Sequence, residues 1–537
     1  MATDAASLRL EIQQAEGGFV NANENSDPSL VIQSITTLGK ICYDPLVPDS
    51  TYTVAGLTGN AAATTILDTR VFAQNSDAYS PLQVLNLTLQ YTSSTTNNTP
   101  IFRSTLGGDS MMPIKLDTLK FTGQHGGWTG NGNTYMSLSS FKAADSSPTS
   151  NIYFTLNNSM IDVTGQANFN STTGAGGAAF IQSWNNSGTT SLTTNIIDES
   201  GFQSSFHFAS QITNTGGGSQ HGMYLISGNN FNRASKVASS GLTDQSLFRA
   251  RGNRLENVNA TVTGNTFRQG SYLDLYGDVS NITVSGGNTF STIYGTTPTS
   301  PTSPSCGIRF NKTSSSGATL SGTSGISTKV TGNIFNGTGL AIVNNDSTAN
   351  SIIAINSTST NTVRLGTSTP SIFQTFRNMY AAGKGADTMN YSSSTTTNWI
   401  SGDQGNDTIT GGTVNDYIIG GVGSDTISTG TGTDTVIYYN PNEGGDTIAT
   451  GGFTAASDKL AFLSSNFGGI TSLTLNTNFF TGAPPSISGT SPLFFYNTTT
   501  GVLTYDSNGV SAGGDTVIAT FAGTPPILGV TNFQFFS

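Results

Sequence analysis

Aspartates recur at a strict interval in one stretch of this chain. Residues 402–437 read as four consecutive units of nine residues, GDQGNDTIT, GGTVNDYII, GGVGSDTIS and TGTGTDTVI. The sixth position of each unit is an aspartate, namely Asp407, Asp416, Asp425 and Asp434. Carboxylates stacked by such a repeat would repel one another unless a cation lay between them. The spacing therefore predicts a site for a hard divalent cation with oxygen ligands, Ca²⁺ above all.

The remaining residues of each unit indicate how the chain would present these carboxylates. In the pattern G-G-x-G-x-D-x-U-x, a glycine-rich turn precedes a short strand whose apolar residue U enters the core. That residue is, in order, Ile409, Ile418, Ile427 and Val436. Two units make one turn of a parallel β-roll, so loops of successive turns stack and their aspartates face each other. Such a roll should fold because calcium binds it.

Flanking segments extend this pattern in both directions. AGKGADTMN at 382–390 places Asp387 sixth, and NEGGDTIATGG at 442–452 reads as a terminal half-unit. Val414 and Thr429 stand where the pattern has glycine, which weakens individual sites. A calcium-free Gly/Asp-rich linker is the alternative, and four contiguous units disfavour it. The predicted metal-site residues are Asp387, Asp403, Asp407, Asp416, Asp425, Asp434 and Asp446, with Gly402, Gly405, Gly411, Gly420, Gly423 and Gly432 in the turns.

This residue set resembles the RTX (repeats-in-toxin) family of calcium-binding β-roll proteins, over residues 380–537. The resemblance implies several bound Ca²⁺ ions and export by type I secretion through an uncleaved C-terminal signal. A low-calcium cytosol would keep the roll unfolded, and millimolar external calcium would fold it. The N-terminal MATDAASLRLEIQQAEGGF lacks the basic start and apolar stretch of a cleaved signal peptide, as such export implies.

The composition points to an elongated β architecture that positions these loops. Only 9% of the 537 residues are charged, and 64 are glycine. A disordered low-complexity polymer is the alternative, but disorder goes with few aromatic residues, whereas this chain has 30 Phe and 17 Tyr. Short pieces rich in Thr, Val, Ile and aromatics, each closed by Gly or Asn, predict strands almost everywhere.

A Gly-Asn-x-apolar segment recurs through the middle of the chain. Its copies are SGNNF, RGNRL, VTGNTF, VSGGNTF and VTGNIF, ending at Phe231, Leu255, Phe267, Phe290 and Phe335, with a weaker VTGQANF ending at Phe169. We interpret them as coils of about 22 to 24 residues, a length within the range of solenoid repeats. Glycine would permit the sharp turn, stacked Asn would bond between coils, and the last residue would point inward. Hairpin turns of an antiparallel sandwich are the alternative.

The predicted fold class is all-β. A right-handed parallel β-helix over 51–370 follows an N-terminal cap or assembly segment at 1–50. The β-helix is followed by a calcium-binding roll over 371–455. The chain then continues as a C-terminal β region with the secretion signal, at 456–537. The Pro/Thr/Ser-rich residues 293–305 should form a projecting loop, because they suit no central strand.

The net charge and the cysteine content limit which classes of partner the protein could bind. A net charge of −11 argues against nucleic acid and anionic membranes, and no apolar run is long enough to span a bilayer. Cys42 and Cys306 show no metal-ligand spacing, so neither a disulfide framework nor a zinc site is indicated.

An enzyme acting on polysaccharides is the second hypothesis. A β-helix followed by an RTX module is also the layout of alginate C5-epimerases, but their Tyr-Gly-Phe-Asp-Pro-His signature is absent from this sequence. Structural or surface roles are favoured for the three histidines, His125, His207 and His221. The acidic pairs Asp198/Glu199 and Asp274/Asp278 are equally well explained as solvated turn residues. Arg249, Arg251 and Arg254 could contact an acidic sugar, although surface ion pairing is favoured. We therefore predict no catalytic residues.

The low surface charge favours a structural protein over a soluble enzyme, because uncharged β-rods can pack together at little electrostatic cost. We predict a secreted, calcium-dependent structural protein of a bacterial cell surface that assembles with itself into a surface layer (S-layer) or fibril. An extracellular or cell-surface polysaccharide is a further candidate partner. The layout resembles the RTX surface proteins of filamentous gliding cyanobacteria.

Overall fold

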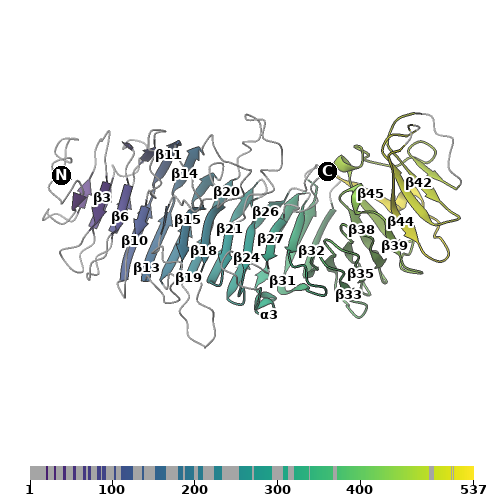
Figure 1. Ribbon diagram of the computed structural model, residues 1–537, viewed down its shortest axis with the longest axis horizontal. Coiled ribbons are helices and arrows are strands. Elements are labelled where there is room, and N and C mark those ends of the chain that lie inside the picture. The colour runs from purple at the N-terminus through teal and green to yellow at the C-terminus, as the bar shows by residue number, and fades with distance from the viewer. Residues whose placement is uncertain are drawn as a thin grey trace. The chain divides into compact units, whose positions relative to one another are not determined.

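The computed structural model is built almost entirely of short strands (Figure 1). It describes isolated strands between residues 20 and 104 and most of the chain beyond, in the ranges 111–124, 136–137, 151–164, 179–184, 188–198, 204–209, 223–232, 253–268, 271–292, 306–311, 320–337, 339–366, 372–482, 489–509 and 513–537, with residue 511. Helical structure within these ranges is confined to short segments, α3 (Thr323–Ile326), η3 (Pro441–Glu443), η4 (Ser464–Asn466) and η5 (Val530–Asn532). Residues 293–305, predicted to be a loop, lie outside the described residues.

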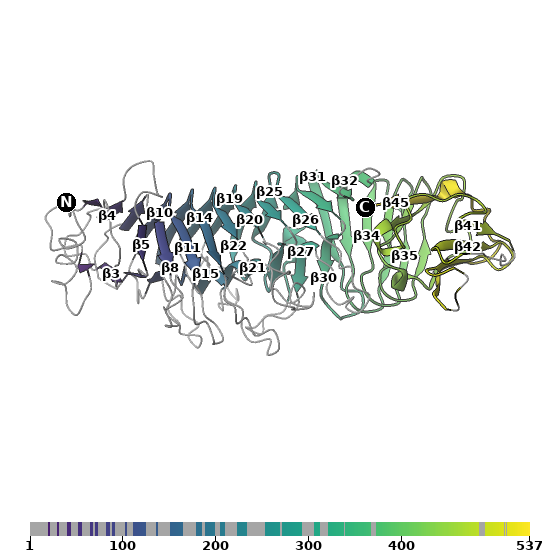
Figure 2. The same cartoon turned by 90° about the horizontal axis from the view of Figure 1, so that it is seen from above.

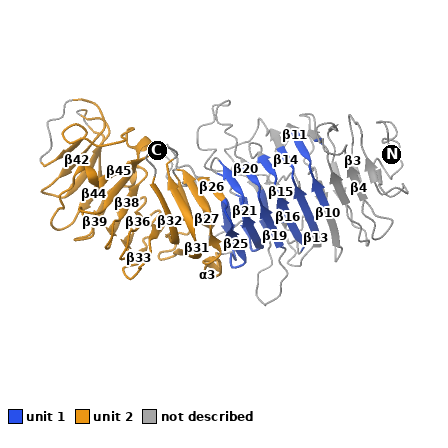
Figure 3. Cartoon of the chain, turned by 180° about the vertical axis from the view of Figure 1, so that it is seen from behind, with its two compact units in different colours: residues 1–288, 313–318 blue, residues 289–312, 319–537 orange. Residues whose placement is uncertain are grey.

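The chain divides into two compact units, Met1–Asn288 with Thr313–Ala318, and Thr289–Lys312 with Thr319–Ser537 (Figure 3). The first unit contains three sheets in which strands of successive turns pair in parallel (Figure 2). Sheet I consists of β1 (Val20–Asn21), β3 (Lys40–Tyr43), β6 (Arg70–Ala73), β9 (Phe102–Ser104), β12 (Met136–Ser137), β15 (Ala179–Trp184), β18 (Ser204–Ala209), β21 (Asn253–Glu256) and β24 (Leu273–Tyr276). Sheet II consists of β2 (Ser29–Val31), β4 (Tyr52–Ala55), β7 (Leu82–Leu85), β10 (Met111–Asp117), β13 (Asn151–Asn157), β16 (Thr189–Thr193), β19 (Met223–Ser227), β22 (Asn259–Thr263) and β25 (Ile282–Ser285). Sheet III consists of β5 (Thr65–Leu67), β8 (Thr88–Tyr91), β11 (Lys120–Gln124), β14 (Met160–Thr164), β17 (Ile196–Asp198), β20 (Asn230–Asn232) and β23 (Thr266–Arg268).

A buried ladder of asparagines marks the tight turn between sheets II and III. The backbone N–H of Asn195 donates to Oδ1 of Asn229 at 3.0 Å, and that of Asn229 donates to Oδ1 of Asn265 at 2.9 Å. Asn265 makes the same contact with Asn288 at 3.0 Å. The predicted stacking of Asn residues is thus confirmed. The residue before the ladder position adopts a left-handed conformation, with φ of 64° at Gly228 and 63° at Gly264, which glycine adopts without strain.

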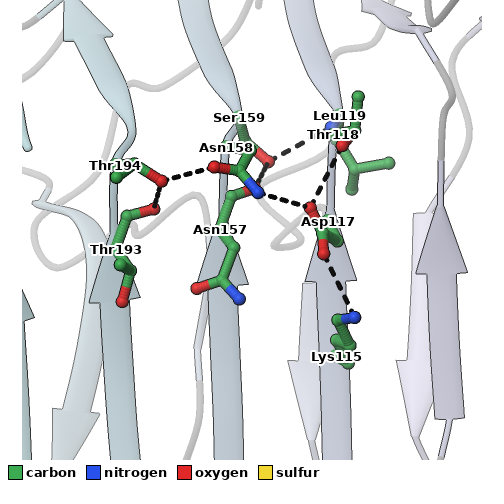
Figure 4. A network of polar contacts seen from close by, with 9 residues as sticks. All are labelled: Lys115, Asp117, Thr118, Leu119, Asn157, Asn158, Ser159, Thr193 and Thr194. Carbon is green, nitrogen blue, oxygen red and sulfur yellow. Dashed lines mark hydrogen bonds and ion pairs between the residues drawn. The ribbon is translucent and has the colours of Figure 1, made fainter. Parts of the chain in front are cut away.

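The same turn carries non-glycine residues in earlier coils, and a polar network holds them (Figure 4). Asn158 has φ of 47°, and its Nδ2 donates to Oδ1 of Asp117 at 3.1 Å. Lys115 forms an ion pair with the same carboxylate at 3.1 Å, and the hydroxyl of Thr194 donates to Oδ1 of Asn158. Burial alone would raise the pKa of Asp117, but hydrogen bonds from Asn158, Lys115 and Thr118 outweigh it and lower the pKa below its usual value. The network thus holds non-glycine residues in the left-handed conformation that glycine adopts at this turn in later coils.

The predicted coil length of 22 to 24 residues is wrong for most of the coils. Phe231 pairs with Phe267, one coil of 36 residues, and Phe290 pairs with Phe335, so the interval of 45 is a single step. RGNRL is no copy of the motif, because Leu255 lies in β21 of sheet I whereas Phe231 and Phe267 lie in sheet III. Only the strands of a solenoid must stack, so residues inserted between strands lengthen a coil without changing its register. The inward position is confirmed, since the rings of Phe231 and Phe267 are buried and stacked 4.8 Å apart.

The second unit contains the parallel pair β27 (Cys306–Asn311) and β30 (Leu340–Asn344), the short strand β28 (Val330–Thr331) and two larger sheets. Sheet IV consists of β26 (Thr289–Thr292), β29 (Ile334–Gly337), β31 (Ile353–Leu365), β32 (Ile372–Ala381), β34 (Asn398–Ser401), β36 (Tyr417–Ile419), β38 (Thr435–Tyr438), β40 (Lys459–Leu463) and β45 (Phe533–Phe536). Sheet V consists of β33 (Thr388–Asn390), β35 (Thr408–Thr410), β37 (Thr426–Ser428), β39 (Asp446–Ile448), β44 (Asp515–Phe521), β43 (Val502–Asp506), β42 (Leu493–Asn497) and β41 (Phe479–Thr481). Cys306 is buried, and the side chain of Cys42 lies outside the described residues.

Strands on both sides of the repeats continue the sheets of the second unit. β31 and β32 pair antiparallel, whereas β32 pairs in parallel with β34, so this hairpin precedes the stacked repeats. After the repeats, β44 adds to β39 in sheet V and β45 adds to β40 in sheet IV. The prediction of an all-β chain with stacked parallel sheets, a roll and a C-terminal β region is confirmed.

Candidate metal centre

Consecutive nonapeptides form strands in alternate sheets. Thr408 of β35 pairs with Thr426 of β37 in sheet V, and Tyr417 of β36 pairs with Thr435 of β38 in sheet IV. Residues 18 apart are therefore neighbours, which confirms two nonapeptides per turn. The predicted inward residues are buried in one hydrophobic cluster, namely Ile409, Ile418, Ile427 and Val436. The strands are only three or four residues long, so each loop returns to the same place one turn later.

The aspartates form two columns, one beside each sheet. In the first column the backbone N–H of Asp387 donates to Oδ1 of Asp407, that of Asp407 to Oδ1 of Asp425, and that of Asp425 to Oδ1 of Asp446, at 2.8 to 2.9 Å. In the second column the corresponding donors and acceptors run from Asn398 through Asp416 and Asp434 to Asp458, at 2.7 to 3.1 Å. Backbone hydrogen bonds thus occupy one oxygen of each stacked carboxylate and leave the other for a different partner.

That second oxygen has no hydrogen-bond donor at three inner positions. Oδ2 is buried and unsatisfied in Asp407, Asp425 and Asp434. Buried polar atoms are almost always paired, and an isolated buried carboxylate is costly. An oxygen-seeking divalent cation would satisfy them. These residues fit calcium, which supplies the charge that the columns lack.

Protein donors satisfy the outer carboxylates instead. Oδ2 of Asp446 accepts the hydroxyl of Tyr438 at 3.0 Å. Oδ2 of Asp458 accepts the Thr429 hydroxyl at 2.9 Å and the Thr454 N–H at 2.7 Å. Oδ2 of Asp387 faces the N–H of Gly383 at 3.3 Å, and Oδ2 of Asp416 accepts the N–H of Gly412. The demand for a cation is therefore greatest in the middle turns.

The turn glycines allow the main chain to approach these carboxylates. A Cβ at Gly402 would lie 2.4 Å from Oδ2 of Asp407 and 2.4 Å from the Gly420 carbonyl oxygen, and one at Gly420 would lie 2.4 Å from Oδ2 of Asp425. Gly411 faces the Thr429 carbonyl in the same way. Gly405, Gly423 and Gly432 have φ of 142°, 152° and 137° and stack on main-chain atoms of the preceding turn. All six predicted glycines thus lie where a side chain would collide with the loops.

Burial disfavours the charged form of these carboxyl groups when no counterion is present. Burial, together with the neighbouring carboxylates of Asp425 and Asp387, raises the pKa of Asp407 to about 7. Burial likewise raises the pKa of Asp425 to about 6 and that of Asp434 to about 7. The pKa of Asp446 rises to about 8, and that of Asp416 is also raised. A bound divalent cation would reverse this by favouring the charged form.

Two members of the columns were not predicted, and one predicted residue lies apart. Asp458 was missed because it lies 24 residues after Asp434 and so breaks the nine-residue spacing. Asn398 keeps that spacing, nine residues before Asp407, and was missed because it is an asparagine. Each precedes an x-apolar pair, Lys459-Leu460 and Trp399-Ile400. Asp403 lies in neither hydrogen-bonded column. It bends the turn with φ of 72°, and its carbonyl accepts the N–H of Val422 at 2.8 Å.

The donor set differs from that of clustered metal sites. Among the described residues, no group of three or more His, Cys, Asp or Glu side chains is placed to hold one ion. Each loop of the roll instead contributes one carboxylate to the columns beside glycine-rich main chain, so carbonyl oxygens would supply most of the remaining ligands. Also within the described residues, no helix is long and apolar enough to cross a membrane.

The fold and the site together define a parallel β-solenoid that carries a roll built for cations. Comparison with known families agrees: residues 397–436 match the RTX calcium-binding nonapeptide repeat, in four copies. This segment is therefore a set of RTX calcium-binding repeats, which suggests a type I secreted protein. The match covers a small part of the 537 residues. A search of curated proteins found no match to the chain.

The structure places some of the other chemically capable residues. His125, His221, Arg249, Arg251 and Glu199 lie outside the described residues. Asp278 is a turn residue whose carboxylate accepts the N–H of Ser280 at 2.9 Å. Asp274 is different, because it lies within β24 and is buried, so its interpretation as a solvated turn residue is wrong. Arg254 forms the expected ion pair, with Glu256, but the pair is buried and does not lie on the surface.

Proposed function

We propose that this protein is a secreted, calcium-dependent structural protein of a bacterial cell surface that assembles with itself into a layer or fibril. The observation that carries the proposal is the pair of aspartate columns, with buried, unsatisfied Oδ2 atoms at Asp407, Asp425 and Asp434. A roll of this kind is unstable until a cation binds, because folding would otherwise bury uncompensated carboxylates. Assembly would then begin where calcium is plentiful, outside the cell.

Composition and sheet edges support the assembly. Charged residues make up only 9% of the chain, so copies can approach with little long-range repulsion. In the strand order of the first unit, β1, β2 and β5 are terminal in their sheets. A terminal strand presents backbone groups that can pair with another chain. The layout resembles that of RTX surface proteins of gliding cyanobacteria such as oscillin.

Export through a C-terminal type I signal is part of the proposal. The RTX repeats support it, and the last residues form β45, whose Phe535 and Phe536 are buried in the folded protein. Deleting β42 to β45 should retain the protein inside the producing cell. Equal amounts of full-length and shortened protein in the medium would contradict the signal.

A polysaccharide-modifying enzyme is the second candidate. The observation favouring it is the gathering of Arg254, Glu256 and Asp274 on one face of sheet I. Incubation with alginate or pectate should leave both polymers unchanged under the structural proposal. New unsaturated ends or an altered uronate composition would establish the enzyme instead.

Electron microscopy of the full chain tests the structural proposal. Protein held in chelator should be dispersed, and millimolar Ca²⁺ should produce ordered filaments or sheets. A variant with Asp407→Ala, Asp416→Ala and Asp425→Ala should remain dispersed in calcium. The control is Asp515→Ala, which removes an exposed carboxylate outside the columns and should assemble normally. Dispersed wild-type protein at every calcium concentration would refute self-assembly.

A further inference from the structure

Basic residues are concentrated in one stretch of a chain that is acidic elsewhere. Between Asp278 and Asp387 the sequence contains six basic residues and a single acidic one, Asp346, which gives this stretch a net charge of +5. Residues 387–537, by contrast, contain eleven acidic residues and one basic residue, Lys459. The six basic residues are Arg309, Lys312, Lys329, Arg364, Arg377 and Lys384. A local charge opposite in sign to that of the whole chain indicates a surface for an anionic partner.

Two of these residues lie on the antiparallel hairpin β31–β32, whose strands run side by side (Figure 2). Arg364 of β31 pairs with Phe373 of β32. Leu365 and Ile372, the next pair along the hairpin, are buried, so the alternation of side chains directs Arg364 and Phe373 outward. Arg377 lies further along β32, where the register between the strands shifts, and it is exposed as well. The hairpin thus presents two cations and an aromatic ring to solvent.

The protein itself does not neutralise these two arginines. Among the described residues, ion pairs join Lys115 to Asp117 and Arg254 to Glu256, and neither Arg364 nor Arg377 takes part in one. Asp346, the one carboxylate of the basic stretch, is buried and accepts the Ser351 hydroxyl at 2.7 Å. Both guanidinium groups therefore remain available to an anion from outside.

Arg364 and Phe373 form a mixed polar and aromatic surface. The guanidinium carbon of Arg364 lies 5.2 Å from the centre of the Phe373 ring, a cation–π contact. The Phe373 side chain is nevertheless 53% exposed, which leaves a large apolar area in water. A partner with an anionic group beside an apolar face would contact the guanidinium and the ring at the same time.

The acidic roll of a second copy is a poor source of that anion. Of the eleven acidic residues in 387–537, ten are buried and Asp515 is exposed. Bound calcium would neutralise the columns further. Nucleic acid is disfavoured as well, because its dense phosphates require clustered cations and the chain as a whole has a net charge of −11. A polysaccharide with single anionic groups on its sugars fits better, since the sugar rings also have apolar faces that pack on aromatic side chains.

We propose that the β31–β32 hairpin binds an anionic polysaccharide. A carboxylate or sulfate group pairs with the Arg364 guanidinium while its sugar ring packs on Phe373, and Arg377 pairs with a second anionic group. Phe373 and Arg377 are four residues apart on one strand, about 13 Å, which exceeds one sugar ring and therefore favours a polymer over a single sugar. The proposal goes beyond self-assembly and gives the protein a ligand at residues outside the calcium-binding repeats.

Calorimetric titration of the full chain in millimolar calcium tests the site. The anionic probes are hexagalacturonate, which carries carboxylates, and a carrageenan hexasaccharide, which carries sulfates; the tighter of the two identifies the anionic group. Cellohexaose is the neutral probe, and a single-stranded DNA oligonucleotide represents nucleic acid. At least one anionic probe should bind, with cellohexaose at least tenfold weaker. Failure of both anionic probes, or tighter binding of cellohexaose or DNA, would overturn the proposal.

Charge variants locate the binding on the hairpin. Arg364→Gln with Arg377→Gln should weaken the Kd of the anionic probe at least tenfold, because two charge-assisted contacts are lost. The melting temperature should not change, since both side chains are exposed. Arg268→Gln is the matched control, because it removes an exposed arginine from β23 and should leave Kd unchanged. An equal effect of Arg268→Gln and Arg364→Gln would show that net charge alone attracts the probe, which contradicts the site.

The aromatic contribution has a different signature. Phe373→Thr keeps a good strand former and should weaken Kd at least fivefold without changing how Kd depends on salt, whereas the double arginine variant should show a flatter salt dependence. Wild-type affinity in Phe373→Thr would overturn the packing of a sugar ring on Phe373. Calcium-induced assembly, followed by microscopy, should persist in the double arginine variant, so failure of the polysaccharide site and failure of self-assembly are distinguishable.

Discussion

The asparagine ladder of the first unit and the aspartate columns of the second use the same main-chain contact with opposite electrostatic outcomes. The N–H of Asn195 donates to Oδ1 of Asn229, and the N–H of Asp407 donates to Oδ1 of Asp425 in the same manner. The second polar atom differs. Nδ2 of Asn229 donates to Oδ1 of Asn265 at 3.0 Å and to the Leu192 carbonyl at 2.8 Å. Oδ2 of Asp425 finds no donor.

Replacing an NH₂ group by an oxygen therefore converts a self-sufficient ladder into one that requires a cation. Asn398 shows the change within one column. It occupies an aspartate position, and its Nδ2 donates to Oδ1 of Asp416 at 2.8 Å, whereas Asp434 two turns on has an unsatisfied Oδ2. The two units should consequently respond differently to calcium.

Calcium removal should produce the largest difference between them. In chelator the roll should unfold, because its carboxylates then lack a counterion, while the asparagine ladder needs none. Hydrogen exchange should show lost protection at β35 and β37 and retained protection at β20 and β23. Equal loss in both regions would contradict the comparison.

Low pH should partly substitute for calcium in stabilising the folded roll. The pKa values of Asp407, Asp425 and Asp434 are raised to about 6 to 7 from an ordinary value of 3.8, so the folded, metal-free roll binds more protons than the unfolded chain. Its stability in chelator is then greatest below the ordinary pKa and is lost as pH rises through the raised values. Thermal unfolding in chelator should therefore occur at a higher temperature at pH 5 than at pH 8. In calcium the dependence should weaken or reverse, since protons compete with the ion.

Introducing an aspartate into the asparagine ladder should damage the first unit. Asn265→Asp removes the Nδ2 donations to the Ile226 carbonyl and to Asn288, at 2.7 and 3.0 Å, and buries a carboxylate. We expect a loss of about 3 kcal/mol in the free energy of unfolding. Calcium should not restore it, because this ladder lacks the roll's alternating turn glycines. Urea unfolding with and without calcium measures both effects, and Asn281→Asp, at an exposed position, is the control.

The reverse change should make the roll less dependent on calcium. Asp407→Asn with Asp425→Asn replaces unsatisfied oxygens by donors that can reach the turn carbonyls. Each relieved group is worth about 1 to 3 kcal/mol in chelator. The variant should resist chelator better than the wild type and gain less from added calcium, as followed by circular dichroism. Asp515→Asn should behave like the wild type, and an unchanged calcium response in the double variant would show that the ions lie elsewhere.

Features that depend on local sequence patterns could be predicted from the sequence. Features that depend on contacts between distant residues could not. The nonapeptide spacing located the inward residue Ile409 and the column residue Asp407, because both follow from an 18-residue turn. Coil length in the first unit failed because inserted loops separate strands without altering their pairing. Asp458 was missed because its column position depends on a turn of irregular length. The burial of Arg254 and Asp274 depends on which strands become neighbours, which their sequence surroundings do not show.

The two-nonapeptide turn also restricts how such a gene can change length. Thr408 pairs with Thr426, and the sheets receive repeats alternately. Duplicating 18 residues adds one whole turn and leaves all later strands in their sheets. Duplicating a single nonapeptide would move every later repeat to the opposite sheet and bring β39 and β40 to the wrong C-terminal partners, which are now β44 and β45. Heritable variation in the number of repeats should therefore occur in pairs.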